Sequence, residues 1–420
     1  MLMRCALLAI IVSGATVVLW QLPTDRGTVP VGSWPIAVAV DDRTGHIFVI
    51  NNTDGRHPGT VTILNAATGE VIRTIAVGVL PVAVAIDERR GHVFVINQKS
   101  SSVSMLDATS GQVLHTIGVG RVPAAIVVDE TTGRAFIPTG TGDVPHSGQV
   151  SIIDTARGAL LRTVRVGDAP VAVAVDTHTQ RVFVPTEGTM ICPSSRACHL
   201  SGSAVSILDA RRGTVIRTVL LGTAPRSVVV DQRAGRAVIS AGGGRVSLLN
   251  TDTGQVLHTG TIAQEVNELA VDSQTGRVFV LCGNDQNSDS SVSTLDVHSG
   301  RVLQTTRIGH AASPMAVDER RGRVVIANVN DSTLSVIDAR TGRLVRTLTT
   351  IAQGPTALAV SERSGHIFVA SADVSNGPAS STGNDHTLLA LLGHMAANGL
   401  KVLRHGQTGS VRVLDARALH

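Results

Sequence analysis

The sequence predicts an all-β fold built from one structural unit that is repeated eight times. Apolar residues make up 43% of the 420 residues, but aromatic residues make up only 2% and tyrosine is absent. The core must therefore be filled by Val, Ile, Leu and Ala, of which Val and Ile favour strands. The 42 Gly and 15 Pro indicate many turns. This composition excludes a coiled coil, a helical bundle and a multi-span membrane protein.

An aspartate that closes a short apolar segment marks each copy of the repeat. It recurs every 41 to 55 residues, which is a spacing typical of a unit of four short strands. The marker residues are Asp41, Asp87, Asp129, Asp176, Asp231, Asp272 and Asp318, with Ser361 in the eighth place.

Each copy predicts four strands, which the first copy illustrates as strand a (37–40), strand b (47–50), strand c (61–64) and strand d (71–75). Strand a is almost continuously apolar, as in a strand that is buried on both faces. Strand d alternates apolar with polar residues, as in a half-exposed outer strand. Four-stranded units graded from buried to exposed describe the blades of a β-propeller. Eight blades are expected, with seven as the alternative count.

The two ends of the chain predict how the ring closes. The eighth copy has strands a, b and c, and the sequence then ends at residue 420 without a strand d. Residues 27–32, which precede the first Pro35, have the pattern of a strand d that belongs to no copy. An N-terminal strand that completes the last blade would remove both open edges, which otherwise favour aggregation.

The second copy resembles the YVTN-type β-propeller repeat. The resemblance is carried by the segments that end at Asn97, Asp107 and Gly120, and by Pro123, and it extends over about residues 27–417. Phe, Val or Ile replaces the Tyr of the family motif, and its Asn is kept only at Asn51, Asn97 and Asn328. The resemblance implies an exported bacterial or archaeal propeller, related to surface-layer and periplasmic proteins. It implies no particular activity.

Residues 1–24 differ from the repeats and predict export. Arg4 precedes an apolar run over residues 5–20, which is typical of a signal peptide. The alternative is an uncleaved membrane anchor, although the run is slightly short for a span. In both cases residues 25–420 form the propeller domain outside the cytoplasm, either secreted, periplasmic or anchored. This segment is the only part expected to contact a membrane.

The charge pattern argues against nucleic-acid binding. The net charge is +4, and the basic residues are scattered among acidic ones instead of forming a basic run. Nucleic-acid surfaces usually combine a basic face with stacking aromatic side chains, which this chain nearly lacks.

The loops between strands b and c differ in length among the copies. They are extended in copies 1, 3, 4, 6 and 8, and the largest insertion covers about residues 372–409. In a propeller these loops share one face with the d–a loops, so the insertions decorate one rim, where function is commonly located. Cys192 and Cys198 lie within the insertion of copy 4 and predict a disulfide in an exported protein.

The b–c loop of copy 6 has the oxygen spacing of a calcium loop at Asp285, Asn287 and Asp289. Ser290 stands where such a loop needs glycine, so an ordinary hairpin loop is favoured. We therefore expect no cofactor, with calcium at these three residues as the alternative.

Departures from the repeat are the best candidates for function, because shared positions serve the blade. At the d–a junction most copies carry Pro, but copy 6 lacks it and has Glu265, Asn267 and Glu268 near the expected channel. Other copies add to the candidate ligand-binding set at this junction with Trp34, Arg121, Arg226 and His310. Two alternatives are neutral drift on an exposed loop and a structural ion pair between Arg226 and the copy 6 acids.

These features favour a non-enzymatic scaffold that binds a protein, a glycan or a small molecule through its loop-rich face. The alternative is a propeller enzyme of the lactonase or periplasmic dehydrogenase type, with a channel metal or a redox partner. The sequence contains no nucleophile elbow, no His-Glu-x-x-His motif and no Walker-type loop. Because no complete catalytic set is present, binding is the favoured hypothesis.

Overall fold

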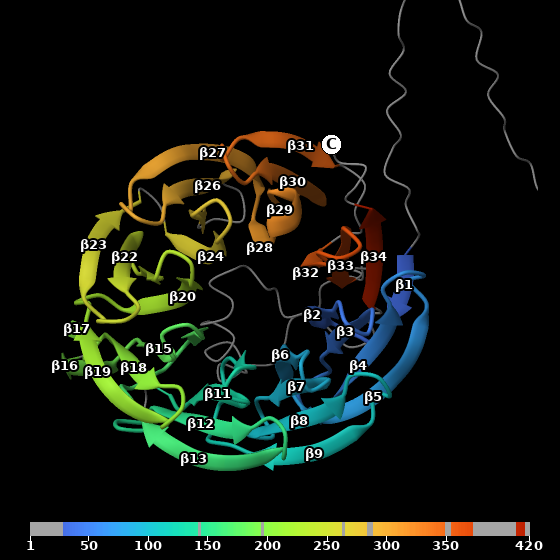
Figure 1. Cartoon of the computed structure of the whole chain (residues 1–420), viewed down its shortest axis with the longest axis horizontal. Helices are drawn as coiled ribbons and strands as arrows, with labels where there is room; N and C mark the ends of the chain where they lie inside the picture. Colours follow the sequence, from blue (N-terminus) through green and yellow to red (C-terminus); the bar gives the residue numbers. More distant parts are fainter. Residues whose placement is uncertain are drawn as a thin grey trace, which may run out of the picture.

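A computed structural model of the protein describes residues 28–141, 144–194, 197–262, 265–283, 289–348, 354–372 and 409–415. Eight four-stranded antiparallel sheets follow one another around a central channel in the order of the sequence (Figure 1). The all-β prediction and the count of eight blades are confirmed, and seven blades are excluded.

Within a blade the strands lie side by side in chain order, from the channel to the outer wall. Blades 1 and 2 consist of β2 (Pro35–Asp41), β3 (His46–Asn51), β4 (Pro58–Asn65) and β5 (Val71–Val79), then β6 (Pro81–Asp87), β7 (His92–Asn97), β8 (Ser102–Asp107) and β9 (Val113–Gly118). Blades 3 and 4 consist of β10 (Val127–Asp129), β11 (Arg134–Thr139), β12 (Gln149–Asp154) and β13 (Ala159–Arg165), then β14 (Ala174–Asp176), β15 (Arg181–Thr186), β18 (Ala204–Asp209) and β19 (Thr214–Leu220).

Blades 5 and 6 consist of β20 (Pro225–Asp231), β21 (Arg236–Ala241), β22 (Arg245–Asn250) and β23 (Val256–Thr261), then β24 (Val266–Asp272), β25 (Arg277–Cys282), β26 (Asp289–Asp296) and β27 (Val302–His310). Blade 7 consists of β28 (Ala312–Asp318), β29 (Arg323–Asn328), β30 (Thr333–Asp338) and β31 (Leu344–Leu348), with the 3-10 turn η1 (Glu319–Arg321) after β28.

Blade 8 closes the ring as the sequence predicted. It contains β32 (Pro355–Val360), β33 (His366–Ala372) and β34 (Gly409–Asp415). Its outer strand is the N-terminal β1 (Thr28–Val31), which pairs antiparallel with β34 from Thr28 opposite Arg412 to Val31 opposite Gly409. Segments far apart in the sequence thus complete a single sheet, in which β1 covers the outer edge of β34.

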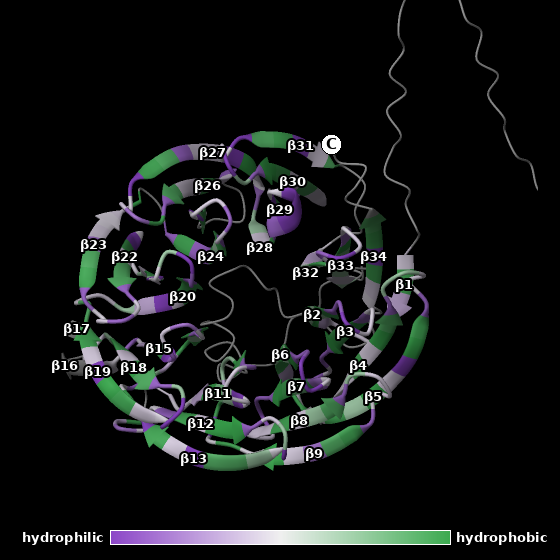
Figure 2. Cartoon of the chain, viewed as in Figure 1, coloured by the Kyte–Doolittle hydropathy of each residue, from purple (hydrophilic) through white to green (hydrophobic). Residues whose placement is uncertain are grey.

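The core consists of separate apolar clusters between neighbouring blades. Hydrophobic residues follow the strands, while hydrophilic residues gather in the turns (Figure 2). Strand b is the most buried strand, and in six blades its centre carries a fully buried phenylalanine: Phe48, Phe94, Phe136, Phe183, Phe279 and Phe368. The scarce aromatic residues of the chain are therefore used where two blades meet.

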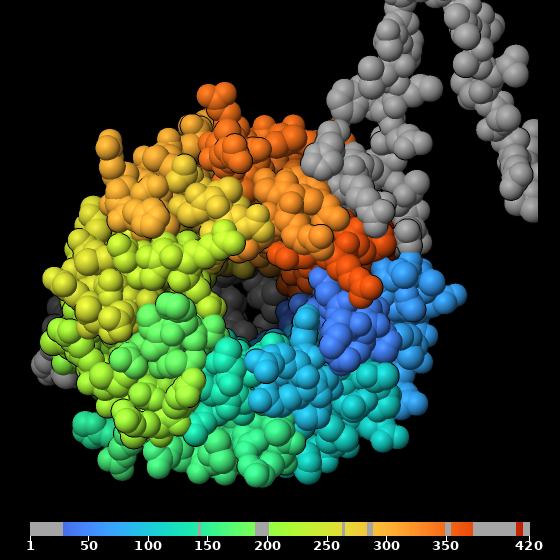
Figure 3. All heavy atoms as spheres, viewed as in Figure 1, coloured from blue at the N-terminus to red at the C-terminus, as the bar shows by residue number. Residues whose placement is uncertain are grey.

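Strand a is less buried than its apolar sequence predicts. In β2 the residues between Pro35 and Asp41 are all half-buried, whereas five of the six residues of β3 are buried. The innermost strands border the open channel (Figure 3), so their side chains keep part of their surface accessible. The predicted gradient from a fully buried strand a to an exposed strand d was wrong at its inner end.

The repeated aspartate builds the turn between strands a and b. Asp41 is fully buried, and its Oδ1 atom accepts hydrogen bonds from the backbone N–H groups of Arg43 at 2.9 Å and Thr44 at 3.1 Å. Gly45 then takes a φ of +70°, a conformation that favours glycine. Side-chain capping of this kind explains why Asp and Gly recur together.

The insertion of blade 4 forms a two-stranded hairpin, β16 (Thr189–Ser194) with β17 (Ala197–Ser201). Cys192 lies in β16 and Cys198 in β17, but their side chains are outside the described part of the chain, so the disulfide stays a prediction. Most of the insertion at about 372–409 also lies outside the described residues. In the described part, no helix has the length and apolar character needed to span a bilayer.

Candidate functional site

The d–a corners and the b–c loops lie together on one face, as expected. In blade 1 the backbone N–H of Asn52, which follows strand b, donates to the carbonyl of Trp34 at 3.0 Å. The same bond joins Gln98 to Leu80 at 2.8 Å in blade 2, and Gly283 to Glu265 at 3.3 Å in blade 6. We call this surface the loop face, and the opposite one, with the a–b and c–d turns, the turn face.

The strand register identifies which residue copy 6 has changed. The first residue of strand a faces the end of strand b, as Pro35 faces Asn51 and Val266 faces Cys282. The next residue, Asn267 in blade 6, is bulged out of the pairing. The position after the bulge is held by small residues in blades 1, 2, 5 and 8, namely Ala37, Ala83, Ser227 and Ala357, but by Glu268 in blade 6.

Glu268 places a carboxylate between blades 6 and 7 beside the channel. Its Oε2 atom accepts a hydrogen bond from the backbone N–H of Met315 in β28 at 3.0 Å. Burial of the half-buried side chain raises the pKa of Glu268 to about 7, and the bond from Met315 only partly opposes this rise. Burial that is incompletely compensated disfavours the charged form. Near neutral pH, this carboxyl therefore exchanges between its charged and neutral forms.

Glu265 is held by structural partners. Its Oε1 atom accepts a hydrogen bond from the backbone N–H of Gly243 at 2.9 Å. Its Oε2 atom lies 3.6 Å from Nη1 of Arg226 in the neighbouring blade, and the two side chains are 27% and 43% exposed. The ion pair considered from the sequence thus exists for Glu265. Oε2 is nevertheless inaccessible to solvent and makes no hydrogen bond with a described residue.

His310 bridges two carboxylates on the loop face. Its Nδ1 atom lies 3.0 Å from Oδ1 of Asp331, and its Nε2 atom lies 3.2 Å from Oδ1 of Asp289. Its backbone N–H also donates to Oδ2 of Asp331 at 2.7 Å. The ring lies between the two acids instead of converging with them on one point. The arrangement links the d–a corner of blade 6 to the b–c loops of blades 6 and 7.

The other two candidates lie on the same face but in distant blades. Trp34 precedes β2 in blade 1 with a φ of +45°, and Arg121 lies in the d–a corner of blade 3. Five non-glycine residues just before strand a share such a positive φ, which makes it a property of the corner: Trp34, Leu80, Val122, Ala169 and Ala311. No hydrogen bond or ion pair of the described residues joins Arg121 to the acids of blade 6. The structure therefore pairs Arg226 with Glu265, while Glu268 and His310 contact other partners in blades 6 and 7. Trp34 and Arg121 lie in other blades.

The described residues do not show a metal site at the calcium candidates. Asp285 and Asn287 are outside the described residues, and Asp289 contacts His310. Within the described ranges, no group of three His, Cys, Asp or Glu side chains is arranged to hold a metal ion. Cys282, at the end of strand b, is fully buried and not in a disulfide, and burial raises the pKa of its thiol to about 12.

Comparison with known proteins supports the fold and is less specific about the family. A family model described as outer membrane protein assembly factor BamB matches residues 201–377, which is less than half of the chain. No curated protein matches this chain.

Three solved structures are similar over most of the chain. The computationally designed Ika8 protein has 17% identity and a TM-score of 0.62, covering 81% of this chain and 94% of that one. Hydrazine synthase from Kuenenia stuttgartiensis has 18% identity and a TM-score of 0.52, with coverages of 81% and 94%. Sqt1 from Saccharomyces cerevisiae has 11% identity and a TM-score of 0.64, with coverages of 82% and 94%. At these identities the similarity establishes the fold alone.

The sequence interpretation missed the partners of the candidate residues. Asp331 and Met315 were not among the predicted residues, because their contacts cross from one blade to the next. A signal for them exists in the repeat: the end of strand d in one blade meets the end of strand b in the next, as where the N–H of Gly78 donates to Oδ1 of Asn97 at 3.0 Å. Applied to copies 6 and 7, this rule places Asp331 near His310.

Proposed function

We propose that the protein is an extracytoplasmic scaffold that binds a ligand at the loop face, with contacts centred on Glu265, Asn267 and Glu268. Glu268 carries the proposal. Four other blades form with Ala or Ser at this position, so a blade does not require a carboxylate there, and burial of the carboxylate costs free energy. Perturbed carboxyls beside a channel are more frequent at functional sites than elsewhere.

Two further observations support the same location. The Oε2 atom of Glu265 is a buried acceptor without a hydrogen bond from a described residue, and a ligand donor would satisfy it. At the d–a junction, the residue that follows Pro or the residue in its place is apolar in blades 1 to 4 (Ile36, Val82, Ala124 and Val171) and polar in blades 5 to 8 (Arg226, Asn267, Ser313 and Thr356). A ligand bound at the loop face over the channel would contact apolar junction residues from blades 1 to 4 and polar ones from blades 5 to 8.

The wider context of the proposal comes from the sequence. The YVTN-type resemblance and the N-terminal apolar segment favour a location outside the cytoplasm, and the family model that matches residues 201–377 is named for an outer membrane protein. In this proposal residues 1–24 direct export or anchor the protein, and residues 25–420 are the propeller domain. The ligand is a protein, a glycan or a small molecule, and nucleic acid is not expected.

Titration calorimetry tests the site with two probes, the cationic peptide Gly-Lys-Gly and the neutral glycan maltotriose. We expect saturable binding of at least one probe and a loss of at least tenfold in affinity for Glu268→Gln. If the cation is the probe that binds, it should release protons near pH 7, because a positive charge favours the ionised carboxyl. The released protons appear as a binding heat that depends on the buffer.

Glu265→Gln is the matched comparison, because it removes the same charge three positions before Glu268. Loss of binding without loss of stability supports a site. Binding that neither substitution alters contradicts the proposal. Reduced stability with unaltered binding would mean that these acids form structural pairs only.

The enzyme hypothesis is tested separately by elemental analysis of the purified protein. A metal bound in a one-to-one ratio would favour the lactonase or dehydrogenase alternative, and calcium at that ratio would point to the loop at Asp285, Asn287 and Asp289.

A further inference from the structure

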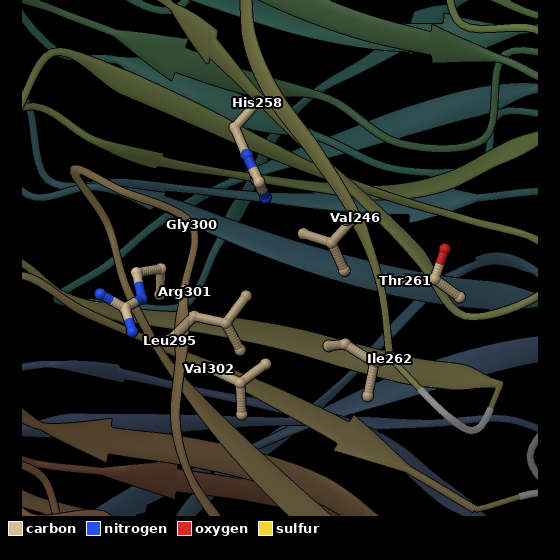
Figure 4. A pocket seen from close by; sticks show the side chains of 9 residues that line it. Val246, His258, Thr261, Ile262, Leu295, Gly300, Arg301 and Val302 are labelled. Atoms are coloured by element: carbon tan, nitrogen blue, oxygen red, sulfur yellow. The ribbon is translucent and has the colours of Figure 1, made fainter.

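A pocket of about 280 Å³ opens on the outer wall at the seam between blades 5 and 6 (Figure 4). One side is formed by β23 and its neighbour β22, and the other by the c–d turn of blade 6. Apolar side chains lie in its middle, namely Val246, Ile262, Leu295 and Val302, and more polar side chains lie around them (Figure 4). The volume is near the lower end for ligand pockets, which indicates a small ligand.

The pocket exists because one side chain of the repeat is missing. Gly260 in β23 pairs with Val246 of strand c. In the other blades, the outer-strand residue that pairs with the strand c residue corresponding to Val246 has a larger side chain. These residues are Ile75, Ile117, Val164, Val219, Thr306, Leu348 and, in blade 8, Val29. Blade 5 is therefore the exception among the eight.

In blade 1 the corresponding side chain fills the seam. A Cβ atom on Gly111 in the c–d turn of blade 2 would lie 2.8 Å from Cδ1 of Ile75, so Ile75 packs closely on that turn. At the seam of blades 5 and 6, Gly260 has no side chain with which to do the same, and the space over Val246 and Leu295 stays open.

The backbone gives no reason for glycine at this position. Gly260 is not among the residues with positive φ, so other residues can adopt its conformation. Glycine inside a strand lowers stability and commonly marks a place where another group approaches closely. A Cβ atom on Gly260 would lie 3.1 Å from Nε2 of His258, so a side chain here requires the His258 ring to shift. Space for a ligand is a second reason that fits the position.

The polar rim of the pocket is cationic. Arg301 and Thr261 are exposed. The backbone N–H of Arg301 donates to the Ser299 hydroxyl at 3.4 Å, but no ion pair or hydrogen bond joins its guanidinium to a described residue. The ring of His258 lies over Gly300, 2.4 Å from where a Cβ atom on that glycine would be, and its nitrogen atoms have no hydrogen-bond partner among the described residues. An unpaired guanidinium beside an apolar floor favours a carboxylate carried on an apolar group.

We propose that this pocket, which we call the seam pocket, binds a small amphipathic carboxylate. The apolar part lies on Val246, Leu295 and Val302 in the space that Gly260 leaves open, and the carboxylate pairs with Arg301. The site is on the outer wall, so it is separate from the site at the loop face.

The test uses 3-phenylpropionate as the probe and 3-phenylpropanamide as its uncharged counterpart, titrated into the full chain and followed by ligand-observed NMR. We expect saturable binding of the acid at least fivefold tighter than of the amide. Gly260→Val fills the pocket and should weaken binding at least tenfold. Arg301→Gln should reduce the affinity for the acid to that for the amide.

Two matched variants provide the controls. Arg343→Gln removes an exposed arginine at the same turn position in blade 7, and Gly118→Val adds a side chain to an outer-strand glycine whose Cβ would meet nothing within 4 Å. Both should bind the acid as the natural protein does. Absence of saturable binding, or binding that Gly260→Val leaves intact, would overturn the proposal. Equal affinities for acid and amide would overturn the pairing with Arg301.

Discussion

The two faces of the propeller follow different rules. On the turn face the same interactions recur in blade after blade. The buried aspartate of strand a accepts hydrogen bonds from its own turn, as in Asp129, Asp231 and Asp272. The next residue often reaches back to the preceding blade, as where a carboxylate oxygen of Glu130 accepts from the N–H of Glu88 at 2.7 Å, and one of Glu319 accepts from the N–H of Ser273 at 3.1 Å.

On the loop face one backbone bond recurs, but the loops and the side chains differ among the described parts of the blades. Loop lengths differ, a hairpin is inserted in blade 4, and the side chains at the start of strand a change from apolar to polar around the ring. Glu268 accepts a bond from a backbone N–H of the next blade, and the ring of His310 lies between two carboxylates. The comparison indicates that the turn face maintains the ring, while the loop face is where the repeat was free to vary and to carry a binding site.

Deleting residues 28–31 should have the largest effect, because it breaks the ring on which both faces depend. The deletion opens the edge of β34 and exposes apolar surface that Val29 and Val31 cover. Loss of these two side chains alone should cost roughly 4 kcal/mol, and the free edges should cause aggregation. Urea unfolding and light scattering measure both effects. An unchanged unfolding midpoint would contradict closure by β1.

Asp129→Ala should have the next largest effect, on the turn face. Asp129 is fully buried, and its carboxylate accepts from the N–H of Thr131 at 2.9 Å and from the hydroxyls of Thr131 and Thr132 at 2.6 and 2.7 Å. Losing these bonds should lower the free energy of unfolding by about 3 kcal/mol. Asp252→Ala, at an exposed turn position, should change it by less than about 0.5 kcal/mol. Equal effects would contradict a special role for the buried aspartate.

The turn face and the fold could be predicted from the sequence because eight copies repeat the same signals. The recurring Asp and Gly located the a–b turns, and counting strands located β1 as the closing strand. Burial of strand a was overestimated because its sequence is apolar on both sides, and the sequence does not contain the width of the channel.

The candidate site could be predicted only in part. The departure of copy 6 from the repeat drew attention to Glu265 and Glu268, but not to the difference between them. That difference arises from contacts across blades, such as the one between Glu268 and Met315, which are 47 residues apart in the chain. The seam pocket depends on the absence of a side chain at Gly260, which becomes a signal only once the strand register is known.

Glu268→Gln should have a smaller effect on stability, which depends on pH. The pKa of the carboxyl is about 7 in the folded chain against 4.5 for an exposed glutamate. Between these values the folded state keeps a proton that the unfolded state loses, so this contribution is full below pH 4.5 and is lost as the pH rises through 7. The glutamine variant should therefore be more stable than the natural protein by about 3 kcal/mol at pH 8, and this advantage should shrink to about 1 kcal/mol at pH 5.

Urea unfolding at the two pH values measures this difference. Glu70→Gln, in an exposed turn, is the control and should show the same stability relative to the natural protein at both values. A stability change for Glu268→Gln that is the same at pH 5 and pH 8 would contradict titration of this carboxyl.

The smallest effect on stability is expected from breaking the ion pair of Arg226 and Glu265. This test distinguishes Glu265, which has an ion-pair partner, from Glu268. Their closest charged atoms are 3.6 Å apart and the arginine is 43% exposed, so solvent and salt screen the attraction. A double-mutant cycle with Arg226→Ala and Glu265→Gln should give a coupling energy of about 0.2–1 kcal/mol that decreases when the salt concentration is raised. The bond from the N–H of Gly243 survives in the glutamine variant, since its amide oxygen still accepts. A coupling well above this range and insensitive to salt would mean that the pair is a buried structural element, and Glu265 would then belong with the regular interactions of the turn face instead of the binding site.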